Sequence, residues 1–241
     1  MTKLRNLLVL TTGLLWGLTS HAVNRVAVHY NERPPYMSTA DSGIAIGLTA
    51  TPASRAFQSA GIPHYWTLTP SIRQLEIIRQ NTGRDCAIGW FKNPEREAYA
   101  KYSKVIYQDK PTIGLALASN TKIASGDSIE NVLKNKNIRV LVKSGYSYGA
   151  YIDGLIQKLE PTIYDVTVEN INMLQMLNVD RADFFFIAEE EAEGLIEISG
   201  FPAMNYQYIN FIDAPFGNKR YIICSMQVED SVIDGLNQWL P

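Results

Sequence analysis

The sequence lacks several features that assign a chain to a class. Its 22 basic and 24 acidic side chains leave a net charge of −2, so it has no excess of positive charge for a nucleic acid partner. It contains no GxGxxG sequence and no phosphate-binding P-loop. With only three histidines and two cysteines, no pair of these residues has the spacing of a metal site. We expect no nucleic acid, no metal and no cofactor.

What is present is ordinary globular material. Of the 241 residues, 46% are hydrophobic and 19% are charged, which is typical of a folded chain rather than a disordered one. The 11 prolines and 16 glycines follow no fixed period, which excludes collagen-like and low-complexity classes. The length suits one large domain or two small lobes.

The first 22 residues differ from the rest and have the pattern of a secretory signal peptide. Lys3 and Arg5 precede an uncharged apolar run at 7–18, and 20–22 end in the small residue Ala22. The alternative is an uncleaved membrane anchor, but the run is shorter than the ~20 residues that a spanning helix needs. Cleavage after Ala22 leaves 219 residues with a net charge of −4, and we expect the product in the periplasm.

Export changes the interpretation of the two cysteines, Cys86 and Cys224. An even number of cysteines in an oxidising compartment favours a disulfide. The alternative is two buried thiols that act as small apolar residues. A catalytic thiol is disfavoured because neither residue lies in a nucleophile motif.

Hydrophobic patterning predicts alternating strands and helices, typical of an α/β fold with parallel-type sheets. Thr51, Thr69 and Asn93 are each followed by proline, which predicts three helices that begin with a cap and then a proline. We expect strands at 25–30, 65–68, 87–88, 112–118, 139–142, 166–168, 184–187 and 221–224. We expect helices at 52–60, 70–80, from 94, and at 128–133, 148–159, 171–179, 189–196 and 228–240.

The segment 145–149 reads Gly-Tyr-Ser-Tyr-Gly and matches the nucleophile motif GxSxG between a strand and a helix. A hydrolase of that kind places its histidine after the serine, whereas His29 and His64 both precede Ser147, so catalysis by Ser147 is disfavoured. A second interpretation is an anion site made of Tyr146, the Ser147 hydroxyl and free N–H groups at a helix start. A plain strand-to-helix turn is the third.

A second turn, at 89–96, also leads from a strand into a helix. Arg96 falls at the third helical position, near the carboxyl end of the strand, where ligands of open α/β sheets bind. An arginine there can hold a carboxylate with two hydrogen bonds, and Trp90 and Phe91 can supply a stacking wall. Alternatively, Arg96 is a solvated helix residue and Trp90 belongs to the core.

Two further segments are candidates. The loop 31–36 carries two prolines and ends in Tyr36, which either lines a cleft or packs internally. Glutamates at 189–191 and 193 begin a helix, where acids interact favourably with the positive end of the dipole. For most of these glutamates, a solvated acidic face is the preferred interpretation.

Taken in order, these segments resemble the bacterial extracellular solute-binding proteins of family 3, which bind polar amino acids for ABC uptake systems. The resemblance covers nearly the whole chain after residue 22. It is carried by the segments at 26–36, 47–61, 89–96, 145–147 and 180–184.

The resemblance implies two α/β lobes of the type II periplasmic-binding-protein fold, joined by two crossover strands with the ligand between them. Lobe 1 would comprise 23–110 and 219–241, and lobe 2 would comprise 111–218. Arg96 matches the position that holds the ligand carboxylate, and Tyr146 and Ser147 match the turn of the second lobe. Cys86 and Cys224 would both lie in lobe 1.

Several positions depart from the family pattern, among them Thr49 and Thr51, where the family has aspartates at a helix entry, and three positions of the ligand site. Phe91 replaces a hydroxyl residue, Arg33 replaces an aromatic residue that stacks on the ligand, and Ala188 replaces an aspartate that binds the ammonium group. Glu189, beside Ala188, is a candidate substitute. These departures argue against an ordinary amino acid and leave a small carboxylate-bearing molecule as the expected ligand. The aromatic set around the site suits an apolar or planar part of such a ligand.

The sequence thus predicts a monomeric periplasmic binding protein, not an enzyme, that delivers a small polar, carboxylate-bearing ligand to an ABC permease. The predicted ligand residues are Tyr36, Trp90, Phe91, Arg96, Tyr146, Ser147 and Glu189. One alternative is a ligand-sensing protein for a receptor in the inner membrane. Another is a dehydratase-like periplasmic enzyme on the same fold, with Glu32 or Glu189 as its acid or base.

Overall fold

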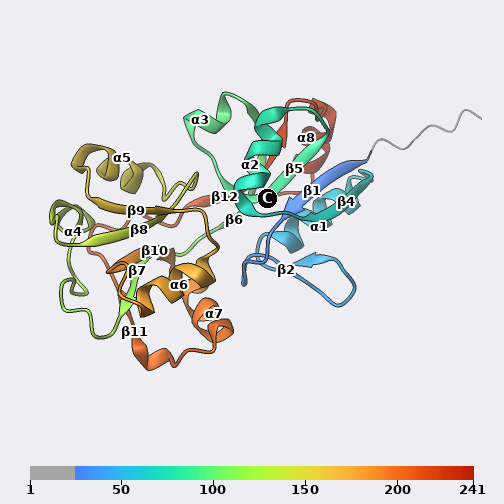
Figure 1. Cartoon of the computed structure of the whole chain (residues 1–241). Coiled ribbons are helices and arrows are strands. Elements are labelled where there is room, and N and C mark those ends of the chain that lie inside the picture. The colour runs from blue at the N-terminus through green and yellow to red at the C-terminus, as the bar shows by residue number, and fades with distance from the viewer. Residues whose placement is uncertain (1–24) are drawn as a thin grey trace, which may run out of the picture.

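The computed structural model describes residues 25–241, so the predicted signal peptide at 1–22 lies outside the described residues. Within them the chain forms two lobes, each built on a five-stranded sheet (Figure 1). In the figure, helices cover the faces of both sheets, and β6 and β12 run between the two groups of elements. The predicted α/β class with two lobes is therefore confirmed.

The first sheet has the strand order β4-β1-β5-β12-β6. The strand β1 (Val26–Tyr30) pairs in parallel with β4 (His64–Leu68) on one side and with the central strand β5 (Asp85–Phe91) on the other. The strand β12 (Lys219–Ser225) pairs antiparallel with β5 and with β6 (Ala100–Gln108). The last strand of the chain thus returns to the sheet that the first strand began.

Helices bury the apolar side chains of this sheet. Phe57, Val28 and Ile88 are at most 1% exposed and belong to one core beneath α1 and α8. The other elements of the lobe are α1 (Ala50–Ser59), α2 (Ser71–Gln80), α3 (Pro94–Glu97), α8 (Asp230–Asn237) and the hairpin strands β2 (Ser38–Thr39) and β3 (Ala45–Ile46).

The second sheet has the order β11-β7-β10-β8-β9. Its parallel part consists of β8 (Arg139–Lys143), β9 (Thr162–Val166) and β10 (Phe184–Ala188). The strand β7 (Thr112–Leu117) runs antiparallel to β10 and to β11 (Tyr206–Ile209). Both sheets are therefore mixed rather than purely parallel.

Helices of the second lobe pack on both faces of its sheet, which gives this lobe two apolar clusters. Phe184 and Phe185 are at most 1% exposed and point to opposite faces, as neighbours on a strand must. The other elements are α4 (Ile129–Lys134), α5 (Ala150–Leu159), α6 (Asn170–Asn178), α7 (Glu189–Ser199) and the 3-10 helix η1 (Ala203–Asn205).

The chain crosses between the sheets twice, through 109–111 from β6 to β7 and through 210–218 from β11 to β12. The two crossings lie side by side, as the hydrogen bond from the Asp109 N–H to the Asn218 carbonyl at 2.9 Å shows. The lobe boundaries expected at residues 110 and 219 stay a prediction.

The structure corrects several predicted elements. The strand predicted at 166–168 is wrong, since β9 spans Thr162–Val166, where it pairs with β8 in register. The strand β11 and most of the strand β6 were not predicted. Both pair antiparallel near the crossings, and their positions depend on long-range pairing more than on local alternation.

Two of the three predicted caps are also corrected. The helix α1 begins at Ala50, and the Thr51 hydroxyl accepts from the Gly47 N–H at 3.1 Å. The helix α2 begins at Ser71 after Pro70, and the hydroxyl of Thr69 bonds to His29. Asn93 caps α3 as predicted.

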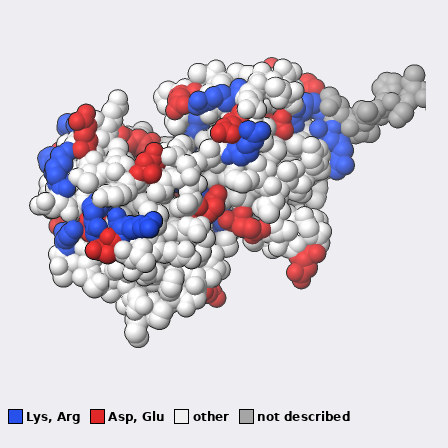
Figure 2. Space-filling model, viewed as in Figure 1, with Lys and Arg blue, Asp and Glu red and all other residues white. Residues whose placement is uncertain are grey.

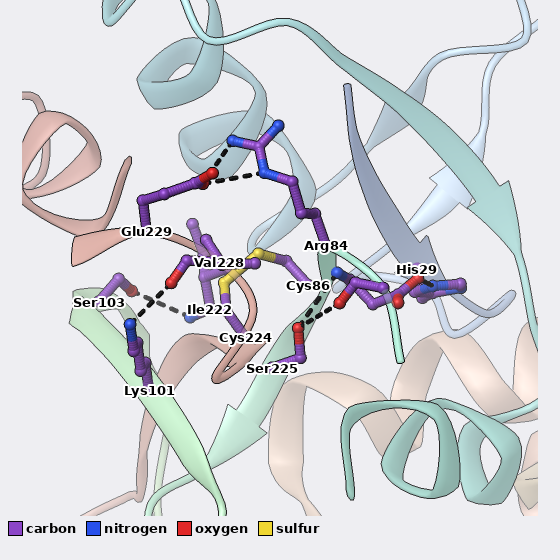
Figure 3. Close-up of a disulfide and its surroundings, with 12 residues drawn as sticks. His29, Arg84, Cys86, Lys101, Ser103, Ile222, Cys224, Ser225, Val228 and Glu229 are labelled. Atoms are coloured by element: carbon purple, nitrogen blue, oxygen red, sulfur yellow. Dashed lines mark hydrogen bonds and ion pairs between the residues drawn. A yellow bond between two sulfur atoms is a disulfide. The ribbon is translucent and has the colours of Figure 1, made fainter. Parts of the chain in front are cut away.

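Cys86 and Cys224 form a disulfide, which confirms the predicted pairing (Figure 3). They lie directly opposite each other on the antiparallel strands β5 and β12, with Cα atoms 4.0 Å apart, and both are fully buried. Figure 3 shows an ion pair between Arg84 and Glu229 beside the disulfide, with 2.6 Å between Nη2 and Oε2. The first sheet is thus held together covalently at its centre.

Charged side chains of both signs are interspersed over the two lobes on the face shown in Figure 2, and a notch separates the lobes at the top of that view. Within residues 25–241, no helix combines the length and the apolar character needed to cross a bilayer.

Candidate functional site

A cavity of about 50 Å³ lies between the two lobes. Trp90, Phe91 and Arg96 line it from the first lobe, and Tyr146 and Ser147 line it from the second. Five of the seven predicted ligand residues therefore meet at one place. The volume has room for a few water molecules, so any larger ligand needs the lobes to move apart.

Arg96 is placed by the cap of the short helix α3. The side-chain oxygen of Asn93 accepts from the Arg96 N–H at 2.9 Å, which fixes the first turn of the helix. The Arg96 residue is 3% exposed, and its guanidinium donates to the carbonyls of Phe91 at 2.8 Å and Gly145 at 2.7 Å. Among the described residues, no carboxylate lies within ion-pairing distance of it.

Two other arginines line the cavity, and both have carboxylate partners. Arg220 donates to both oxygens of Asp109, at 2.5 and 2.8 Å. Arg33 donates to both oxygens of Glu191, at 2.6 and 2.8 Å, from the opposite lobe. Burial alone would lower the pKa of Arg33, but the Glu191 carboxylate outweighs it and raises that pKa well above its ordinary value. Arg96 is thus the unpaired cation of the three.

Aromatic rings form the walls of the cavity. The rings of Trp90 and Tyr146 meet across the lobes with centroids 5.4 Å apart. The Trp90 indole N–H donates to Gln74 at 2.9 Å, which fixes the orientation of the ring. Ile187 and Phe186 add apolar surface from the second lobe. Such a wall suits an apolar or planar part of a ligand.

The second-lobe turn at 145–149 is occupied by a side chain of the same chain. The Ser147 hydroxyl donates to the carboxylate of Asp153, and the Tyr148 N–H donates to the same carboxylate at 2.7 Å. Burial raises the pKa of Asp153, although these two hydrogen bonds oppose the shift. Ser147 lines the cavity, but in this conformation its hydroxyl donates its hydrogen bond to Asp153.

The sixth predicted ligand residue, Tyr36, lies outside the lining of the cavity. It is fully buried, and the Arg220 guanidinium lies over its ring at 3.7 Å from the centroid. Its hydroxyl has no hydrogen-bond partner within the described residues. Burial raises its pKa, so Tyr36 supports Arg220 as a neutral ring.

The seventh, Glu189, also lies outside the lining. Its side chain is half exposed at the start of α7, and its Oε1 lies 3.7 Å from the Nζ of Lys110. Its neighbour Glu191 is the one that faces the first lobe, through Arg33. Glu32, the other acid considered for catalysis, accepts from the Thr39 N–H at 3.0 Å and does not line the cavity either.

Further contacts join the lobes beside the cavity. Glu169 of the second lobe accepts from the Ser71 hydroxyl at 3.1 Å and from the Asn31 amide at 3.4 Å. The same carboxylate pairs with Lys143, which is 3% exposed. These contacts and the Arg33–Glu191 pair show that the structure is a closed arrangement of the lobes.

Sequence reasoning missed three residues that shape the site. Asp153 lies in the first turn of α5, where a carboxylate commonly caps free N–H groups, so a local signal for it existed. Asp109 and Arg220 are separated by 111 residues and lie in no motif, so nothing local could pair them.

No protein-family model matches the sequence, and no curated protein matches it. Solved structures do. An ancestral arginine-binding protein bound to arginine is similar with a TM-score of 0.70, 13% identity and 89% of each chain covered. The substrate-binding protein of an amino acid ABC transporter is similar with a TM-score of 0.67 and 12% identity, over 89% of this chain and 90% of that one.

A periplasmic binding protein of Salmonella typhimurium with high arginine specificity is similar with a TM-score of 0.66 and 13% identity. That match covers 89% of this chain and 91% of the other. Because these similarities extend over both lobes and both crossings, they identify the architecture. The chain has the two-lobed fold of the periplasmic amino-acid-binding proteins.

Proposed function

We propose that this chain is a periplasmic solute-binding protein that captures a small carboxylate-bearing ligand between its lobes and delivers it to an ABC-type permease without chemical change. The observation that carries the proposal is Arg96, a buried guanidinium that lines the cavity between the lobes and has no carboxylate partner among residues 25–241.

An unpaired buried cation is costly, because its desolvation is not repaid by an opposite charge. A guanidinium has five N–H donors. Arg96 donates from Nη1 to the carbonyl of Phe91 and from Nη2 to the carbonyl of Gly145. These hydrogen bonds hold its plane in place. A ligand carboxylate would supply both the missing charge and acceptors for the remaining donors.

In the proposed complex, Trp90, Phe91 and Tyr146 form the walls around the apolar part of the ligand. Ser147 completes the lining, while Tyr36 supports Arg220 from beneath and Glu189 remains at the rim. The arrangement opens to admit the ligand by a hinge at the two crossings. The proteins of similar fold include an arginine-binding protein and a substrate-binding protein of an ABC transporter, which supports binding for transport.

Native mass spectrometry tests the proposal on protein isolated directly from the periplasm. We expect an added mass from a carried ligand, and cleavage after Ala22. Arg96→Ala should weaken binding of that ligand by at least about 30-fold, the loss expected when one member of a buried charge pair is removed.

Arg79→Ala is the matched control, since Arg79 pairs with Glu95 on the exposed surface of the same lobe. It should bind the ligand as the wild type does. Unchanged affinity in Arg96→Ala would show that the ligand lies elsewhere.

A further inference from the structure

The carboxylates at the cavity are already committed to arginines of the chain. Both oxygens of Asp109 accept from Arg220, a residue that is 2% exposed. Both oxygens of Glu191 accept from Arg33, and Asn170 adds a third donor to Glu191 at 2.6 Å. An ammonium group of a ligand would have to compete with a bidentate arginine for either carboxylate.

The aromatic faces are committed as well. Trp90 has the Arg96 guanidinium 4.9 Å from its ring centroid, and Phe91 has that of Arg220 at 4.8 Å. Tyr146 has Arg33 at 5.3 Å and the ammonium of Lys143 at 4.6 Å. The attraction of these rings for a cation is therefore used by the side chains of the protein.

Carbonyl oxygens could replace carboxylates as acceptors for an ammonium group. However, the carbonyls of Phe91 and Gly145 accept from Arg96, and that of Gly89 accepts from Arg220. The groups best suited to bind an ammonium are thus engaged with guanidiniums.

A second hollow of about 350 Å³ adjoins the cavity, with Arg33 in the lining of both. Its acids are Glu32, Glu169 and Glu191. Glu169 pairs with Lys143, and Glu191 pairs with Arg33. The carboxylates of Glu169 and Glu191 are therefore both neutralised by cations of the chain. Glu32 is exposed and accepts hydrogen bonds from Thr39.

Of the three arginines that line the cavity, Arg33 and Arg220 are ion-paired and Arg96 is not, and the Asp153 carboxylate beneath Ser147 acts on Arg96 only from beyond ion-pairing distance. Resting on the proposed function, we infer that the ligand is a carboxylic acid without an ammonium group, such as an oxo or hydroxy acid, rather than an amino acid. A monoanion matches the single charge of Arg96. A zwitterion would bring a cation whose strongest acceptors at the cavity, Asp109 and Glu191, already accept from arginines, so its desolvation would be poorly compensated.

Isothermal titration calorimetry with matched pairs of acids tests this inference on the wild-type protein after removal of carried ligand. The pairs are pyruvate and L-alanine, 4-methyl-2-oxopentanoate and L-leucine, and phenylpyruvate and L-phenylalanine. We expect at least one oxo acid to bind, and to bind about tenfold or more tightly than its amino acid partner.

An amino acid that binds as tightly as its oxo partner would overturn the inference, and so would a lack of binding by all three oxo acids. Neither result tests the proposed function, which is tested separately by the native mass measurement. A carried ligand that contains an amine would likewise refute this inference and support the proposed function.

Arg33→Gln tests whether the Arg33–Glu191 ion pair causes the preference for the oxo acid, because this variant releases the Glu191 carboxylate for a ligand ammonium. The preference for the oxo acid should shrink in this variant and remain in Arg79→Gln, which removes an arginine from the exposed pair with Glu95. An unchanged preference in Arg33→Gln would show that the Arg33–Glu191 pair does not set the selectivity. Circular dichroism of each variant checks that it has folded.

Discussion

The two strand-to-helix turns that face each other across the cavity differ in how their polar groups are satisfied. The turn at 91–96 presents Arg96, which no carboxylate of the described chain neutralises. The turn at 145–149 presents a serine hydroxyl and backbone N–H groups, but Asp153 already binds them. Both turns have donors suited to an anion, but only the first is open to a ligand. The donors of the second are occupied by Asp153.

The difference shows that an anion site depends on which acids lie near it as well as on its donors. The Asp153 carboxylate reaches back over one turn of α5 to Ser147 and Tyr148. The Arg96 guanidinium donates to two carbonyls, and one of them belongs to Gly145 of the opposite turn. The second turn therefore contributes an acceptor that orients Arg96, and the first turn contributes the charge.

The largest expected effect concerns the strands that lead into the two turns. The strand β5, which precedes the first turn, is tied by Cys86 to Cys224, whereas β8 is held by hydrogen bonds and apolar packing, without a disulfide. The double variant Cys86→Ala, Cys224→Ala should lower the free energy of unfolding by about 2–5 kcal/mol, as for other long-range disulfides. Urea denaturation measures it.

Wild-type protein reduced by a phosphine under denaturing conditions and then refolded is the control, and it should behave as the double variant does. A loss below about 1 kcal/mol would mean that the first turn owes no stability to the covalent tie.

A smaller effect is expected from Asp153, which fills the second turn. Its pKa is raised in the folded protein by burial, so above pH 3.8 the folded state binds more protons than the unfolded state. The wild type should therefore lose stability relative to Asp153→Asn as the pH rises through the folded pKa. We expect a difference on the order of 1 kcal/mol, the size of one hydrogen-bonded side chain.

Urea denaturation of both proteins between pH 3 and 7 measures this difference. Asp165→Asn is the control, because Asp165 accepts from the Ser144 hydroxyl at 2.6 Å at an exposed position of the same lobe. If the wild type gained stability over Asp153→Asn as the pH rose, the carboxylate would have to be stabilised in its charged form.

The smallest effect is expected from Ser147→Ala. Because its hydroxyl donates to Asp153, removal should change affinity for the carried ligand by less than about threefold, in contrast to Arg96→Ala. Titration calorimetry of the two variants compares the turns directly. A tenfold loss in Ser147→Ala would place the hydroxyl on the ligand and make the two turns equivalent.

Much of the fold could be predicted because its elements have local signals. The buried apolar strand at 139–142 and the Asn93-Pro94 cap were visible as patterns and are present as β8 and α3. The position of Arg96 at the third residue of α3 followed from that cap. The helix predicted at 148–159 begins at Ala150 because Gly149, with a φ of 92°, precedes the first helical turn.

The candidate site was predictable only in part. Trp90, Phe91 and Arg96 lie within seven residues of one another, so a single motif located them on the cavity. The ion pairs of Arg220 with Asp109 and of Arg33 with Glu191 join segments 111 and 158 residues apart. No local pattern relates such residues. The pairing of β12 with β6 brings Arg220 to Asp109, and the packing of the two lobes brings Arg33 to Glu191.

The sequence by itself determined the alternation of strands and helices and the arginine at the first turn, because each depends on neighbours in the chain. The disulfide between Cys86 and Cys224, which are 138 residues apart, was predicted instead from the even number of cysteines and the expected export. The tertiary structure alone decided which charges of the cavity are neutralised. Coulomb attraction depends on the distance between two charges in space and on the medium between them, and the separation of two residues along the chain does not enter it. Arg33 and Arg220 therefore have carboxylate partners and Ser147 donates to Asp153, whereas Arg96 has no carboxylate partner among the described residues.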